Sequence, residues 1–244
     1  MKRIASLGVI AFVMLCVFLF SPFAYAQGAI ELTPLRLVLS DSVTTSTLIV
    51  KNRSDTPTLV QLKLLSWSQK NNEDVLEPSR DVLISPPVFT IPANGAQILR
   101  AVLRRKADAN KELCYRLYVR EIEDQSRPVT NGSVNALLNI SIPIFIEPVA
   151  KLSSKLLWHA STDGAHKINI KLVNDGSQHI QIKSFQLSSG SANSISQNVM
   201  RYVLPGNSTK WTFENMDVPF KSPLTLQAIT DKGDLRETIT LEQP

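Results

Sequence analysis

The chain contains 244 residues, of which 43% are hydrophobic and 19% charged, and its formal net charge is +5. A chain of this length can bury one large core or two cores of ordinary size. The charge is too small for a nucleic-acid-binding surface, and no basic stretch with interleaved aromatic residues occurs, so we expect no nucleic acid partner.

The first 26 residues have the pattern of a secretory signal peptide. Lys2 and Arg3 precede an apolar run at residues 9–20, and Ala-Tyr-Ala at residues 24–26 fits the cleavage rule. The alternative is an uncleaved membrane anchor, but the run is short for a span and ends at a Ser-Pro pair. We therefore expect residues 1–26 to be removed. The mature chain then lies outside the cytoplasm and does not insert into a membrane.

The mature chain keeps a single cysteine, because Cys16 is lost with the signal peptide. Cys114 then has no partner for an intramolecular disulfide, and packing must supply the stability. Its neighbours are Leu113 and Tyr115, so we expect a buried thiol that packs as a small hydrophobic group. A catalytic cysteine would need an exposed site with a nearby histidine.

Short runs of alternating polar and apolar residues recur along the chain and predict β-strands. These runs cover residues 47–50, 59–65, 97–103, 115–121, 134–146, 167–173, 180–187, 210–213, 224–230 and 237–241. No later segment holds a helical period, so the predicted class is all-β, with sandwiches the expected architecture. Glu147-Pro148 follows the longest strand, and we place the domain boundary there, giving domains 27–147 and 148–244.

The strand expected at residues 134–146 has one apolar face and a vulnerable edge. Its apolar parity comprises Val134, Ala136, Leu138, Ile140 and Ile142. Pro143 removes one backbone donor from the ladder, which favours a position at the edge of a sheet. A long apolar edge strand promotes pairing with another chain, so we expect pairing to be part of the function.

Several segments carry patterns that occur together, in this order, in one protein family. In the first domain they are Leu32-Thr-Pro-Leu-Arg36, then Ser85-Pro-Pro-Val-Phe-Thr-Ile-Pro-Ala-Asn-Gly95 with Gln97-Ile-Leu-Arg100, then Tyr115-Arg-Leu-Tyr-Val-Arg-Glu-Ile122, and the segment ending Ile144-Phe-Ile-Glu-Pro148. In the second domain they are Leu172-Val-Asn-Asp-Gly176 with His179, and Tyr202-Val-Leu-Pro-Gly206. Together they resemble the periplasmic chaperones of chaperone–usher pili.

The resemblance implies two immunoglobulin-like β-sandwich domains in an angled arrangement. It also implies a periplasmic chaperone that stabilises pilus subunits by donor-strand complementation and delivers them to an outer-membrane usher. The side chains donated to the subunit groove would be Val134, Ala136, Leu138, Ile140 and Ile142. The alternative is an ordinary core strand, and we expect Leu137, Ile144 and Ile146 to face the domain's own core. The sequence leaves open whether the free chaperone caps the same edge by forming a dimer.

The family anchors the subunit's C-terminal carboxylate with an Arg and a Lys. Arg36 matches the Arg, and a guanidinium can bind a carboxylate bidentately. Pro143 occupies the position of the Lys, so Arg100 is the alternative second cation. The absent Lys, together with Tyr202-Val-Leu-Pro-Gly206, resembles the archaic branch of the family.

A second departure concerns the contact between the domains. Better-known members have an Arg before the linker proline that pairs with acids from both domains, whereas this chain has Glu147. By resemblance, Glu121 and Asp231 occupy the acidic positions, and Arg120 and Arg236 are the cations available to compensate.

Two other classes of function remain as alternatives. No HExxH, GxSxG or P-loop pattern accompanies the histidines, so we expect no enzyme, no metal site and no cofactor, and His179 is expected to be a packing or strand-end residue. A periplasmic β-sandwich module that binds carbohydrate or another secreted protein would need an exposed aromatic platform. Trp67, Trp158 and Trp211 are the aromatic residues in question, and their scattered positions favour packing roles.

Overall fold

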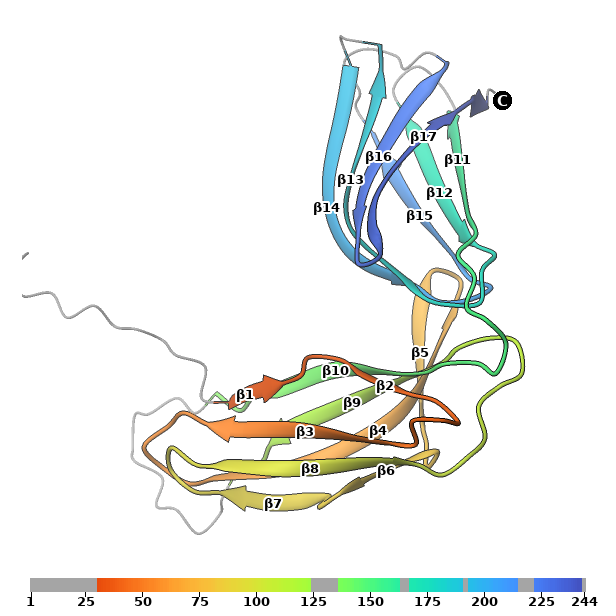
Figure 1. Ribbon diagram of the computed structural model, residues 1–244. Helices are drawn as coiled ribbons and strands as arrows, with labels where there is room; N and C mark the ends of the chain where they lie inside the picture. Colours follow the sequence, from red (N-terminus) through yellow and green to blue (C-terminus); the bar gives the residue numbers. More distant parts are fainter. Residues whose placement is uncertain (1–29, 124–135, 163–166, 191–192, 215–221, 243–244) are drawn as a thin grey trace, which may run out of the picture.

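The computed structural model describes residues 30–123, 136–162, 167–190, 193–214 and 222–242. Within these residues the chain forms β-strands, turns and coil, and no helix that could cross a membrane. The predicted signal peptide, residues 1–26, lies outside the described part. The strands form four sheets, and Figure 1 shows two sandwiches set at an angle to each other. The predicted all-β class with two immunoglobulin-like sandwiches is therefore confirmed.

The first sandwich has two facing sheets. The first sheet contains, in spatial order, β1 (Ile30–Thr33), β3 (Thr45–Asn52), β8 (Ala96–Leu103) and β6 (Val82–Ser85). The other contains β2 (Leu37–Leu39), β10 (Asn139–Ile146), β9 (Leu113–Glu121), β4 (Thr58–Lys70) and β5 (Glu73–Pro78). A further strand of this sheet, β7 (Val88–Ile91), pairs with the start of β4. The chain thus changes sheets between β1 and β2.

The second sandwich follows after a connection from Ile146 to Leu156. One sheet contains β15 (Ser208–Phe213), β12 (Ile168–Asn174), β11 (Leu156–Thr162) and β18 (Leu241–Glu242). The other contains β14 (Asn193–Val203), β13 (Ile180–Ser189), β16 (Leu224–Thr230) and β17 (Gly233–Ile239). The parallel pair of β11 with β18 brings the end of the described chain back to the start of this domain.

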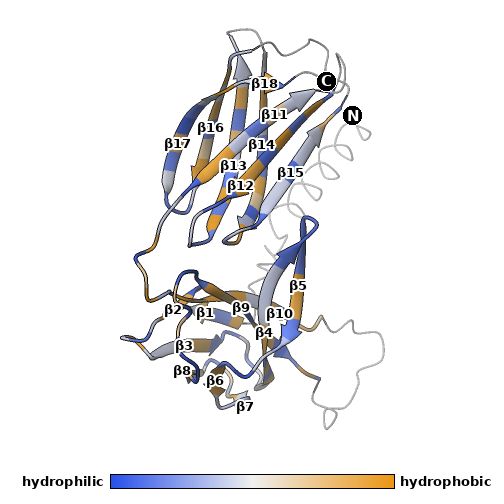
Figure 2. Ribbon diagram, turned by 90° about the vertical axis from the view of Figure 1, so that its right-hand side faces the viewer, coloured by the Kyte–Doolittle hydropathy of each residue, from blue (hydrophilic) through white to orange (hydrophobic). Residues whose placement is uncertain are grey.

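Each sandwich has its own apolar core, made by the inward parity of its strands. Figure 2 shows this alternation as hydrophobic and hydrophilic bands along single strands. Leu48, Val50 and Leu117 are fully buried in the first core, and Phe185 packs with Trp158 in the second. Burying one such side chain contributes roughly 1.5–3 kcal/mol. Since no disulfide is present among the described residues, this packing supplies the stability.

The alternating patterns located the long strands but missed short and exposed ones. The runs at 59–65, 97–103, 115–121 and 224–230 fall within β4, β8, β9 and β16. The alternating runs did not include β5, β11 and β14, nor the short β1, β2, β6 and β7. Five of the six residues of β5 are exposed or polar, so its sequence shows no apolar period. Pairing with a neighbouring strand holds such segments extended instead.

Replacing Ile144 by Ala should lower the free energy of unfolding by about 2–5 kcal/mol, because its side chain is fully buried in the first core. Urea unfolding monitored by tryptophan fluorescence measures the change. The matched control is Ile98→Ala, since Ile98 is 62% exposed and should change stability by less than about 0.5 kcal/mol. Equal effects of the two substitutions would contradict this assignment of the core.

Candidate functional site

The strand β10 is paired fully on one side and only partly on the other. On one side β9 pairs with it from Asn139 to Ile146. On the other side β2 pairs in parallel with Ile144, Phe145 and Ile146 alone. No described strand covers the same edge from Asn139 to Pro143. The expected position at a sheet edge therefore holds for this half of β10.

The inward parity of β10 enters the core of its own domain. Ile144 and Ile146 are fully buried, as expected, and Ile142 is only 2% exposed. Ile140 packs partly against the same core. The prediction that Ile142 is a donated side chain is therefore wrong for this structure, because the opposite sheet already covers it. Ile140 lies at the boundary, half-buried.

The segment before β10 leaves the sheet. The predicted strand began at residue 134, whereas β10 begins at Asn139; Glu121, the last residue of β9, still donates its backbone N–H to the carbonyl of Leu138. Leu138 is half-buried and Ala136 is exposed, whereas Val134 lies outside the described residues. Leu137 is 50% exposed, which corrects the expectation that it faces the core.

The outward parity of β10 and its neighbours forms the contact with the second domain. Trp67, Cys114 and Phe145 come from β4, β9 and β10, and they cluster with Leu204 and Tyr202 of the second domain. The Trp67 and Tyr202 rings meet edge to face at 5.3 Å. Cys114 is buried here as predicted, and burial raises the pKa of its thiol well above the ordinary value of 9.0, with Glu112 adding to the effect.

His179 lies at the centre of this contact. Its ring stacks on Phe145, with centroids 3.6 Å apart and planes inclined by 6°. Its Nδ1 lies 2.6 Å from Oε2 of Glu112, which also accepts the His179 backbone N–H. Its Nε2 lies 3.3 Å from Oδ2 of Asp231, an ion-pair contact without hydrogen-bond alignment. Glu112 belongs to the first domain and Asp231 to the second, so the imidazole joins the two domains.

Arg36 extends this cluster to the surface. One of its guanidinium nitrogens lies 3.1 Å from Oδ2 of Asp231, and its side chain remains 44% exposed. Asp231 also accepts the backbone N–H of Gln181 at 2.8 Å. The predicted anchoring residue is therefore at the domain interface, beside the point where β2 begins.

The surrounding charges shift the pKa values of the buried pair in opposite directions. Burial alone lowers the pKa of His179, but the carboxylates of Asp231 and Glu112 outweigh it and hold the pKa above its ordinary value of 6.5. Burial raises the pKa of Asp231, but His179 and the Gln181 backbone N–H have the larger effect, and the result is a pKa of about 2. The protonated imidazole is thus stabilised between two carboxylates.

A second set of interdomain contacts comes from the hairpin of β4 and β5. Its tip turns through Asn71 and Asn72, both in the left-handed region that asparagine tolerates. Gln69 donates to the carbonyl of Tyr202 and accepts the backbone N–H of Leu204. Figure 1 shows this hairpin reaching toward the second domain. β5 is polar and exposed because it extends toward the second domain and does not pack on the core of the first.

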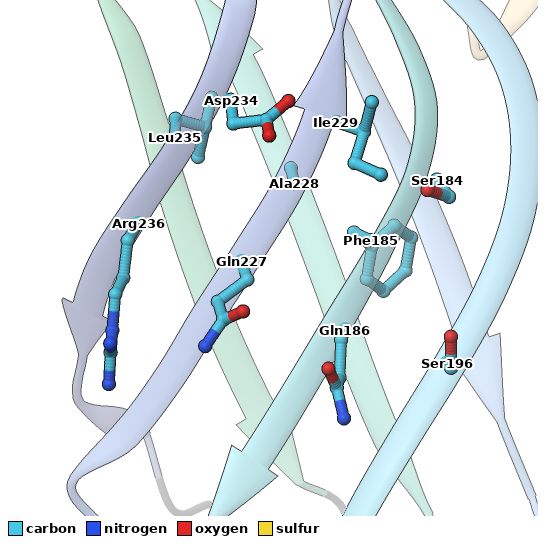
Figure 3. A pocket seen from close by; sticks show the side chains of 10 residues that line it. All are labelled: Ser184, Phe185, Gln186, Ser196, Gln227, Ala228, Ile229, Asp234, Leu235 and Arg236. Atoms are coloured by element: carbon cyan, nitrogen blue, oxygen red, sulfur yellow. The ribbon is translucent and has the colours of Figure 1, made fainter.

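The structure also has a depression of mixed polar and apolar lining on the second domain, away from this contact. Figure 3 shows its walls on β13, β14, β16 and β17, and its volume is about 400 Å³. Its lining includes Gln186, Gln227 and Arg236. Trp67 and Trp158 are buried, and Trp211 packs against the second core. These three residues therefore do not form the exposed aromatic platform that carbohydrate binding would need.

Comparison with known protein families gives a match over the first domain and the linker. Residues 29–151 match the family model of pili and flagellar-assembly chaperones, PapD N-terminal domain. The chain belongs to this chaperone family. A comparison with curated proteins gave no match.

Solved chaperone structures share the fold over both domains. The chaperone–tip adhesion subunit pre-assembly complex CsuC–CsuE, from archaic chaperone–usher Csu pili of Acinetobacter baumannii, is similar at 20% identity and a TM-score of 0.67, over 88% of this chain and 100% of that chain. The Salmonella enterica SafA pilin–SafB chaperone complex is similar at 20% identity and a TM-score of 0.62, over 88% of this chain and 98% of that chain. The E. coli chaperone DraB is similar at 23% identity and a TM-score of 0.59, over 87% of this chain and 96% of that chain.

Several expectations about charged residues in this chaperone need correction. Glu121 lies at the opposite end of β9 from the interface, where its carboxylate accepts the backbone N–H of Leu138. Glu112, which directly precedes that strand, supplies the acid instead. Glu147 donates its backbone N–H to Leu39 and has no ion pair with a described residue. Among the described residues, Arg120 and Arg236 form no ion pair, and the cations at the domain contact are His179 and Arg36.

The structure separates the two predicted anchoring residues. Arg100 lies on the outer face of β8, between Thr47 and Ser85, in the sheet opposite β2 and β10. No described contact joins it to Arg36. The sequence analysis did not identify the outward-facing residues from Glu112 through Arg116 as part of the domain contact. Alternation in the sequence shows that these residues share one face of the strand, but it does not show which part of the chain packs against that face.

The interdomain contact should weaken as the pH rises above neutral. The raised pKa of His179 means that its contribution is complete below about pH 6.5 and is lost as the pH rises through the folded-state value. The contribution of Asp231 is present above about pH 3.8 and is lost only as the pH falls toward 2. Melting temperature and small-angle X-ray scattering between about pH 5 and pH 9 measure the effect. His179→Gln should remove this pH dependence. If the melting temperature of that variant changed with pH as steeply as that of the wild type, His179 would not be the group responsible.

Proposed function

We propose that this protein is a periplasmic chaperone that binds pilus subunits by donor-strand complementation and delivers them to an outer-membrane usher. The observation that carries the proposal is the edge of β10 from Asn139 to Pro143, which no described strand covers. Strand addition at such an edge combines sequence-tolerant backbone bonds with pockets that select alternate side chains. Membership in the chaperone family supports the same function.

The backbone of β10 offers donors and acceptors along this edge. Glu147 donates its N–H to Leu39 of β2, so residues of odd number direct their backbone groups to that side. Asn139 and Ser141 therefore present both N–H and C=O to an incoming strand, and Pro143 presents C=O only. Each bond contributes a net stabilisation of roughly 0.5–1.5 kcal/mol, largely independent of the partner's sequence.

The donated side chains in this proposal are those that lie beyond the chaperone's own core. Leu138 is half-buried and Ala136 exposed at the end of the open edge, and Val134 continues the same parity in the sequence. Ile140 contributes in part, and Ile142 is excluded because it is buried in the first core. Burial of Leu138 in a subunit groove would contribute roughly 1.5–3 kcal/mol, before the cost of ordering the segment.

The start of β2 limits where an added strand can end. Because β2 occupies the edge from Ile144 onward, a strand on Asn139–Pro143 must stop there, beside Arg36. A strand parallel to β10 would bring its C-terminal carboxylate to Arg36, whereas an antiparallel strand would bring a cationic terminus that Arg36 repels. The Arg36 side chain is 44% exposed, so a carboxylate that arrives from solvent can reach its guanidinium beside Asp231.

The remaining parts of the proposal rest on the sequence and the family. The signal peptide at residues 1–26 supports a periplasmic location. Residues 27–147 and 148–244 remain the proposed domains. Pro143 in place of a Lys supports the archaic branch. In the absence of a subunit, a second copy of the chain could cap the same open edge.

Leu138→Asp should abolish capture of a co-expressed pilus subunit, because a carboxylate would enter an apolar groove. The free chaperone should keep its melting temperature, since Leu138 lies outside the buried core. Co-purification from periplasmic extract measures capture. The matched control is Asn139→Asp, which adds the same charge on the opposite parity and should preserve capture. If the Leu138 variant captures as much subunit as the wild type, donor-strand binding through this residue is ruled out.

Arg36→Ala should weaken subunit capture, whereas Arg100→Ala should leave it unchanged, because only Arg36 lies at the end of the open edge. Titration of the subunit measures the affinity, and thermal unfolding verifies that both variants fold. Undiminished affinity for the Arg36 variant would disprove its anchoring role. Loss of affinity for the Arg100 variant would require a different path for the subunit.

A further inference from the structure

We propose that the second domain binds a phosphate monoester on the outer face of the sheet formed by β15, β12, β11 and β18. A depression of about 280 Å³ lies on this face, and it is lined by His159, Ser161, Asn169, Lys171, Lys210 and Glu242. None of these residues lies on β10 or takes part in the contact around His179. The inference therefore goes beyond the proposed function and does not depend on it.

The strand register brings three basic side chains into one row. His159 of β11 is paired with Lys171 of β12, and Lys171 is paired in turn with Lys210 of β15. Figure 2 shows these three strands side by side in one sheet. Directly opposite residues of antiparallel strands have Cβ atoms about 4.5–5.5 Å apart, so the three side chains are immediate neighbours.

The row lies on the outer face of the sheet and is open to solvent. The alternate residues of the same strands, such as Ala160 and Ile170, are fully buried in the second core. His159, Lys171 and Lys210 are all exposed. A ligand can therefore reach the three basic groups together, without any rearrangement of the domain.

The two lysines of the row have no counter-ion among the described residues. Of the acids on this face, Glu214 pairs with Lys167 at 3.7 Å, and Glu242 contacts the ring of His159 at 3.6 Å. Like charges that lie directly opposite on neighbouring strands destabilise a sheet. An anion held between the two ammonium groups replaces this repulsion by two attractive contacts, and lysine binds phosphate in this way as a point charge.

Neutral hydrogen-bond groups adjoin the basic row. Ser161 and Asn169 form the next pair on the same face of β11 and β12. The side-chain oxygen of Asn169 accepts the hydroxyl of Thr212 at 2.8 Å, so its NH₂ group remains available as a donor. Hydroxyl, amide and ammonium groups all donate to phosphate oxygens. The donor set of the depression therefore favours an oxyanion.

The number of charges selects the kind of anion. A phosphate monoester carries close to two negative charges at neutral pH and matches the two unpaired lysines. A carboxylate or a phosphate diester carries one charge and leaves one lysine without a counter-ion. Soluble phosphate compounds and the headgroup of phosphatidic acid share the monoester chemistry, and the experiment below separates these two sources.

The first measurement titrates the full chaperone, purified from the periplasm, with inorganic phosphate and follows its backbone amides by NMR. Sodium chloride at the same ionic strength is the reference. Phosphate should shift amides of β11, β12 and β15 in a saturable manner, and chloride should not. Lys171→Gln should weaken phosphate binding at least fivefold. The matched control is Lys183→Gln, which removes an exposed lysine from the opposite sheet and should bind within about twofold of the wild type.

Stability measurements on the same variants separate a binding site from ordinary surface charge. Without phosphate, Lys171→Gln should melt at a slightly higher temperature than the wild type, because the repulsion with Lys210 is removed. Phosphate should raise the melting temperature of the wild type but not that of Lys171→Gln. Glu242→Gln should bind phosphate at least twofold more tightly, since a carboxylate beside the anion is lost. Subunit capture should be unchanged in both variants.

Vesicles identify the source of the phosphate. The chaperone is sedimented with phosphatidylcholine vesicles that contain either phosphatidic acid, a monoester, or phosphatidylglycerol, a diester. Preference for phosphatidic acid that is lost in Lys171→Gln assigns a lipid headgroup, whereas phosphate binding without sedimentation assigns a soluble ligand. Equal sedimentation with both anionic lipids would refute the proposal, because general attraction then explains it. Phosphate shifts no larger than those with chloride, or equal phosphate binding by Lys171→Gln and Lys183→Gln, would also refute it.

Discussion

The incomplete pairing of β10 is the constraint on which the rest of the site depends. β9 pairs with the strand along its whole length, but β2 covers only its last three residues. The edge from Asn139 to Pro143 therefore keeps backbone groups available, while Ile142, Ile144 and Ile146 secure the strand in the first core. One strand can thus be firmly held and still accept a partner, because its inward face and its edge are separate surfaces.

The outward face of the same strand determines how the second domain is placed. Phe145 stacks on His179, and the imidazole lies between carboxylates from both domains. A protonated histidine is stabilised there by two opposite charges, so the contact combines apolar burial with an interaction that depends on pH. The hairpin of β4 and β5 adds hydrogen bonds at a second point, and two separated points fix the angle better than one.

The end of the open edge is formed by residues from three neighbouring segments. Arg116 of β9 lies opposite Pro143 of β10, and Arg36 directly precedes β2 on the other side. The proline also limits the edge itself, since it removes one backbone donor from the part that β2 leaves uncovered.

The amino-acid sequence alone determined the all-β class, because alternation and turn residues are local properties. Recognition of the family came from motifs that occur in a fixed order along the chain. It did not determine that Ile142 belongs to the core, that Glu112 rather than Glu121 meets the second domain, or that Arg116 lies opposite Pro143. Those facts depend on where β9 ends, on which register it adopts against β10, and on which outward face His179 covers. Only tertiary structure decides them, since the same alternation permits either face and several registers until the strands are packed.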